Sequence, residues 1–77
     1  MKIKYDQKAD AAYIYLSNKP YAYGKNLDNS RRIDYASDGT IIGVELLCLE
    51  KGVNPDNLPE QNKIVKLLEE KHIKVYA

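Results

Sequence analysis

Four stretches of the chain alternate between apolar and polar residues, which is the period of a strand with one buried face. They are residues about 2–5, 11–17, 31–35 and 40–48. The segment Asp6 to Asp10 lies between the first two stretches, and the triplet Ser37-Asp38-Gly39 lies between the last two. Aspartate side chains accept backbone hydrogen bonds in tight turns, and glycine tolerates a positive φ. The pattern therefore predicts antiparallel strands, with a hairpin at each of these turns.

The last third of the chain changes to the spacing of a helix, from about residue 59 to residue 71. Its apolar stripe consists of Ile64, Leu67 and Leu68. Asn57 and Glu60 have the spacing of a capping box at the helix start. Residues 73–76 alternate once more and predict a short final strand.

These elements predict one α+β domain that spans residues 1–77. We expect a small antiparallel sheet of about four strands, covered on one face by the C-terminal helix. Residues 21–27 fit no clear period, since Gly24 allows a bend or bulge, and we expect an irregular strand or loop at the sheet edge.

The fourth predicted strand is apolar on both of its faces, although a half-solvated strand has a polar outer face. Alternation assigns Ile42, Val44, Leu46 and Cys48 to one face, and Ile41, Gly43, Glu45, Leu47 and Leu49 to the other. One helix cannot cover both faces. Exposed apolar surface with tyrosines is typical of a protein contact. We therefore predict a partner-binding surface made of Tyr13, Tyr15, Ile41, Leu47 and Leu49. The alternative is that residues 21–27 or the chain termini cover this face within one monomer.

The size and composition of the chain support an interaction protein. A domain of 77 residues buries only about 60% of its surface on folding, so a second copy or a small partner protein would add stability. Cys48 is the only cysteine, which excludes an intramolecular disulfide. No apolar run has the length of a signal peptide or a membrane span, so we expect a cytoplasmic protein without membrane contact.

A single-stranded nucleic-acid binder is an alternative function. The basic residues available for it are Lys2, Lys4, Arg31 and Arg32, and the tyrosines would stack on bases. However, 12 basic residues against 11 acidic ones give a net charge of +1, which supplies no long-range attraction to a polyanion. Charged edge strands also serve simply to prevent aggregation.

A small metal-dependent hydrolase is a further alternative, in which carboxylates would bind a hard cation. The candidate ligands are Asp6, Asp10, Asp34, Asp38 and Glu45. Their spacing matches no metal-binding loop, and turn capping explains most of them. Glu45, between apolar neighbours, is expected to form a salt bridge with Arg31 or Arg32, or a hydrogen bond with a tyrosine, rather than to act as a base.

The remaining reactive residue types have structural explanations. His72 lies near the predicted helix end, where an imidazolium interacts favourably with the helix dipole. Cys48 falls on the expected core face and would pack there as an inert side chain. The sequence predicts no catalytic residue, metal or cofactor, and a non-catalytic role is favoured over an enzyme.

The order and spacing of several short motifs resemble a small bacterial family known as domain of unknown function 2283, also called YuzE-like. The motifs are Tyr5-Asp6, Ala9-Asp10-Ala11, Tyr13-Ile14, Leu16, Ile33-Asp34-Tyr35, Asp38-Gly39, Ile42-Gly43-Val44-Glu45 and Leu46-Leu47. The resemblance spans Lys2 to about Gly52. The family pattern has an aspartate where this chain has Ala36, which argues against metal binding at that position.

The resemblance implies a compact α+β domain with a small antiparallel sheet and no established activity. Some relatives are thought to lie beside small toxin-like ribonucleases. It therefore implies an antitoxin-like role, in which the protein would cover a toxin's active surface.

Overall fold

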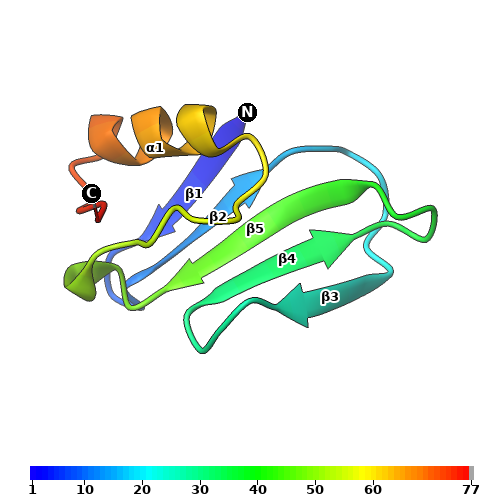
Figure 1. Cartoon of the computed structure of the whole chain (residues 1–77), viewed down its shortest axis with the longest axis horizontal. Helices are drawn as coiled ribbons and strands as arrows, with labels where there is room; N and C mark the ends of the chain where they lie inside the picture. Colours follow the sequence, from blue (N-terminus) through cyan, green and yellow to red (C-terminus); the bar gives the residue numbers. More distant parts are fainter. Residues whose placement is uncertain (77) are drawn as a thin grey trace.

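The computed structural model describes residues 1–76 and confirms the α+β class, with five strands rather than the expected four (Figure 1). The elements are β1 (Lys2–Asp6), β2 (Ala11–Tyr15), β3 (Tyr23–Asn26), β4 (Arg31–Tyr35), β5 (Ile41–Leu47), the short 3-10 helix η1 (Leu49–Lys51) and α1 (Gln61–Glu70). All neighbouring strands are antiparallel, in the order β1-β2-β5-β4-β3.

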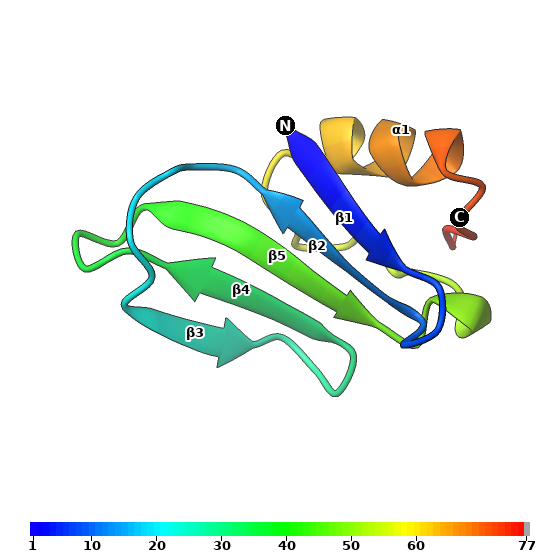
Figure 2. The same cartoon turned by 180° about the vertical axis from the view of Figure 1, so that it is seen from behind.

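The additional strand is β3, in the segment that the sequence left unassigned. It pairs with β4, where Tyr23 lies opposite Tyr35 and the two rings stack with 5.0 Å between their centroids. The connection from β2 to β3 passes the ends of β5 and β4 to reach the far edge (Figure 2). β3 therefore extends the sheet and does not cover either face.

Helix α1 lies against one face of the sheet, as its apolar stripe predicts, and buries Ile64 and Leu68 completely. The core that it closes contains Ala12, Ile14, Ile33, Val44, Leu46, Leu49, Val53, Leu58 and Ile73. The predicted capping box is wrong, because the N-cap residue is Glu60, whose side chain makes no capping hydrogen bond. No helix in residues 1–76 has the length and apolar character that a bilayer span requires.

The chain leaves α1 through a Schellman motif. His72 has φ 59°, and the amides of His72 and Ile73 donate to the carbonyls of Glu69 and Leu68. Beyond it, the predicted final strand is reduced to one isolated parallel bridge between Val53 and Val75.

Two local irregularities in and after β5 change which side chains face the core. A bulge in the pairing with β4 sets Ile41 opposite Tyr35, so Ile41 packs against the helix side and Ile42 turns to the other face. Cys48 then has φ 55° and is exposed, whereas Leu49 enters the core. The faces expected for Ile41, Ile42, Cys48 and Leu49 were therefore wrong.

Candidate functional site

In the described part of the chain, the sheet face away from α1 carries no helix, and Figure 2 looks onto it. Strand register arranges its residues in rows across the sheet. One row contains Lys4, Tyr13, Glu45, Arg32 and Asn26. The next contains Lys2, Tyr15, Gly43, Asp34 and Gly24. We call this surface the open face.

Tyr13 lies flat across the open face because Gly43 has no side chain. A Cβ atom at Gly43 would overlap the hydroxyl and ring of Tyr13. From this position the Tyr13 hydroxyl donates a hydrogen bond to Asp34 Oδ2 at 2.8 Å, which connects β2 to β4 across the intervening β5.

Arg32 reaches Asp34 from the other side, over the second strand glycine. A Cβ atom at Gly24 would overlap the Arg32 guanidinium and Asp34 Oδ1. Arg32 Nε donates to Asp34 Oδ1 at 3.0 Å, and Arg32 Nη2 donates to the Tyr21 hydroxyl at 2.7 Å. Both oxygens of the nearly buried Asp34 carboxylate are therefore engaged.

The protonation states of this network follow from its contacts. Burial, together with the hydrogen bond to Asp34, raises the pKa of Tyr13 far above its ordinary value. The hydrogen bond to Asp34 likewise raises the pKa of Arg32. At neutral pH the phenol is a neutral donor and the guanidinium a cation, so neither group supplies a base or a nucleophile. The network makes a rigid, flat platform instead of an acid–base pair.

A shallow groove of about 550 Å³ lies beside this platform. Tyr13 and Tyr15 line it in an edge-to-face pair with 4.8 Å between ring centroids, together with Tyr21 and Ile42. The β2–β3 connection also contributes Lys19 to its wall.

Lys19 anchors the end of this groove to the β4–β5 turn. Its Nζ bonds Asp38 Oδ2 at 2.6 Å, and this contact holds the pKa of Asp38 well below its usual range. The groove therefore has a fixed wall at the end where the β2–β3 connection passes.

Three of the five predicted contact residues lie on the open face: Tyr13, Tyr15 and Leu47. Ile41 packs against the core and Leu49 is only 3% exposed, so these two are not available to a partner. Ile42 lines the groove on this face instead of Ile41, which the alternation pattern missed because of the bulge, but it is only 7% exposed.

The predicted nucleic-acid residues are divided between the two faces. Lys2, Lys4 and Arg32 share the open face with the tyrosines. Arg31 is buried on the helix side, where Nε bonds Asp28 Oδ2 at 2.9 Å and Nη1 donates to the carbonyls of Asn54 and Asp56. It fastens the loop before α1 and is not a ligand-binding cation.

The candidate metal ligands do not form a cluster: within residues 1–76, no three His, Cys, Asp or Glu side chains gather around one point. Three accept backbone hydrogen bonds instead, but only Asp6 and Asp38 do so within their own turns, whereas Asp10 bonds to η1 and not to the turn expected from the sequence. Asp6 accepts from the Ala9 amide, Asp10 from the Glu50 amide, and Asp38 from the Thr40 amide.

The salt bridge expected at Glu45 is also absent from the part of the chain described, because Arg32 turns to Asp34. Tyr13 likewise directs its hydroxyl to Asp34. Glu45 therefore remains a half-buried carboxylate in the middle of the open face.

The Asp34 network is the part of the site that the sequence reading missed. Gly43 and Gly24 were its signals, because an isolated glycine within a strand often marks the close approach of another group. The glycines do not reveal which side chains approach them.

Together, these features define a small α+β protein with one helix-covered sheet face and one open face built on an aspartate-centred network. Residues 2–48 match the family described as "Protein of unknown function (DUF2283)", and since this is more than half of the chain, the protein belongs to that family. No curated protein and no solved structure matches the chain. The match covers the five strands, all of which lie within it, and ends before α1.

Proposed function

We propose that this protein is a non-catalytic interaction module that forms a homodimer by packing its open face against that of a second copy. The observation that carries the proposal is the open face itself, a flat platform with Tyr15 and Leu47 exposed and no helix above it. Two sheets that pack face to face exclude water from such surfaces in β-sandwiches.

The charges on this face are complementary to themselves. Lys4 and Glu45 flank Tyr13 on either side in the same row. A twofold axis parallel to β2 through Tyr13 would therefore set Lys4 of each copy opposite Glu45 of the other. Isologous contacts of this kind are the commonest in soluble oligomers.

The surface near Tyr13 also has the shape for a close contact. Ala11 and Ala12 leave a small depression of about 110 Å³ between Lys4, Tyr13 and Glu45. In the dimer, a side chain of the second copy fills this depression.

The test is the solution mass from light-scattering chromatography of the wild type, Leu47→Glu, which sets a carboxylate opposite Asp6 of the second copy, and Leu27→Glu. Leu27 is a matched control, since it is 38% exposed against 37% for Leu47 but follows β3 at the far edge of the sheet. We expect a dimeric wild type, a folded monomeric Leu47→Glu and a dimeric Leu27→Glu. A wild type that stays monomeric at high concentration contradicts the proposal.

Charge exchange tests the arrangement within the dimer. Lys4→Glu alone should weaken association by placing two carboxylates opposite each other, and the double variant Lys4→Glu/Glu45→Lys should restore it. If the double variant is no better than the single one, the proposed axis is wrong. A monomer that instead binds a toxin-like ribonuclease through this face would support the antitoxin-like role.

Binding of single-stranded nucleic acid is the second candidate, because Lys2 and Lys4 share the open face with Tyr13 and Tyr15. We would then expect the protein to bind a labelled oligonucleotide with an affinity that falls steeply with added salt. The double variant Lys2→Glu/Lys4→Glu should not bind it. An oligonucleotide that fails to bind even at low salt removes this candidate.

A further inference from the structure

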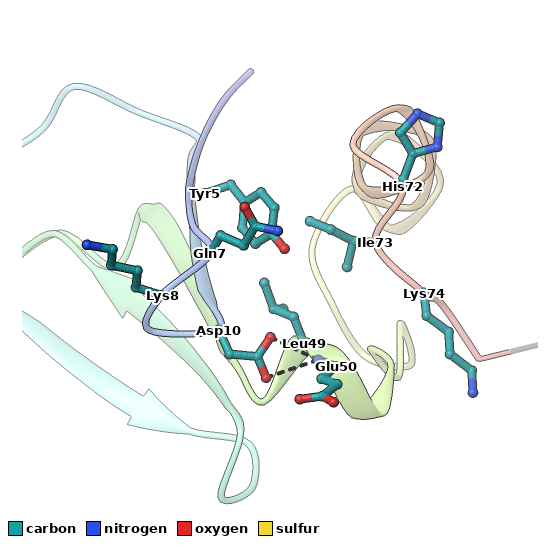
Figure 3. Close-up of a pocket in the computed structure, with 9 residues that line it drawn as sticks. All are labelled: Tyr5, Gln7, Lys8, Asp10, Leu49, Glu50, His72, Ile73 and Lys74. Carbon is teal, nitrogen blue, oxygen red and sulfur yellow. Dashed lines mark hydrogen bonds between the residues drawn. The ribbon is translucent and has the colours of Figure 1, made fainter.

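A second surface, at the edge of the sheet, lies between β1 and the segment that follows α1. Here a recess of about 440 Å³ is lined by residues of the β1–β2 hairpin, η1 and the C-terminal segment (Figure 3). In Figure 3 the side chains of Tyr5, Gln7, Leu49 and Ile73 point toward one another across it. Leu49 and Ile73 are buried and form an apolar floor, whereas Tyr5 is 39% exposed.

The recess adjoins a strand edge that has no neighbour within residues 1–76. β1 pairs only with β2, so alternate amides and carbonyls of Lys2–Asp6 face outward. A segment that added to this edge would hydrogen-bond to β1, and its side chains on the helix side would enter the recess. Ile3 and Tyr5 lie on that side, since they pair with the core-facing Ile14 and Ala12.

The charges of β1 define the sequence of the incoming strand. Lys2 and Lys4 alternate with Ile3 and Tyr5 and point to the opposite face of the sheet. No salt bridge in residues 1–76 engages either lysine. In Figure 3, Lys8 and Lys74 extend outward from the rims of the recess. An added strand therefore meets Lys2 and Lys4, with Asp6 at the strand end, on one face. On the other face it meets a recess with an apolar floor and charged rims that include Asp10 and Glu50.

We propose that the β1 edge binds an extended peptide segment of a partner protein in which acidic and apolar residues alternate. Its acidic residues lie beside Lys2 and Lys4, and an apolar side chain enters the recess between Tyr5 and Ile73. Pairing β1 with β1 of a second copy about its centre would set Lys4 against Lys4 and Lys2 against Asp6, so only part of that pairing is favourable, whereas an acidic strand is complementary at both lysines. The inference does not rest on the proposed dimer, although Lys4 takes part in both contacts.

The probe is a short fluorescein-labelled peptide in which glutamate and valine alternate, with binding followed by fluorescence anisotropy. We expect the wild type to bind it, and both Lys2→Glu and Tyr5→Ser to weaken binding about fivefold. Lys25→Glu and Tyr23→Ser are matched controls on the opposite edge strand, where Tyr23 is 40% exposed, and both should bind like the wild type.

Three changes of the peptide separate strand addition from simple charge attraction. Lysine in place of glutamate, serine in place of valine, and N-methylation of alternate residues on the pairing edge should each abolish binding. The inference is overturned if the wild type does not bind the original peptide, if N-methylation has no effect, or if the β3 variants lose as much affinity as the β1 variants.

Discussion

At the scale of single residues, two glycines explain the conformation of the open face. Gly43 and Gly24 let Tyr13 and Arg32 lie flat, and both side chains then bond to Asp34. The hydrogen bond from Tyr13 to Asp34 joins β2 to β4 across β5, in addition to the backbone hydrogen bonds between neighbouring strands. A partly buried carboxylate is acceptable here because each of its oxygens has a donor.

Gly43→Ala tests this arrangement. The added methyl group displaces the Tyr13 ring and breaks its bond to Asp34, so we expect a loss of about 1–3 kcal/mol in the free energy of unfolding. In a Tyr13→Ala background the ring is gone, and the same substitution should cost less than about 0.5 kcal/mol. Urea denaturation of the four proteins measures both values. Equal costs in the two backgrounds would show that Tyr13 is not what Gly43 accommodates.

At the scale of elements, regular alternation predicted β1, β2, β4 and most of β5, and the apolar stripe predicted α1. The segment Tyr23–Asn26 could not be recognised, because its pairing with β4 depends on tertiary contacts such as the Tyr23–Tyr35 stack. The bulge at Ile41 could not be predicted from the sequence either. A one-residue shift exchanges the faces of a strand, and nothing in Ile41-Ile42 distinguishes the two residues.

The end of α1 supplies a prediction about element stability. His72 occupies the left-handed position of a Schellman motif, where a side chain is strained and glycine is not. We expect His72→Gly to raise the free energy of unfolding by about 0.5–1 kcal/mol. His72→Ala is the control, since it removes the imidazole but keeps the strained Cβ, and it should give no gain. A similar gain in both variants would assign the effect to the imidazole instead.

At the scale of the whole molecule, the fold has two layers, and only one of the two sheet faces is used for the core. A chain of this size buries a smaller fraction of its surface than a larger domain does, so its stability depends strongly on what covers the remaining face. The open face and the β1 edge point in different directions, because one is the broad face opposite α1 and the other is the rim beside it. Both contacts use Lys4, however, so dimer formation and peptide binding should compete for its ammonium group.

The dimer couples stability to protein concentration, because association removes folded monomer from the unfolding equilibrium. We expect the melting temperature of the wild type to rise by about 3 °C for each tenfold increase in concentration. Leu47→Glu should melt at one temperature throughout the same range, since its open face no longer associates, while Leu27→Glu should follow the wild type. Scanning calorimetry over a wide concentration range provides the measurement. A wild-type melting temperature that does not change with concentration would mean that the open face stays solvated and that the single core beneath α1 supplies the stability alone.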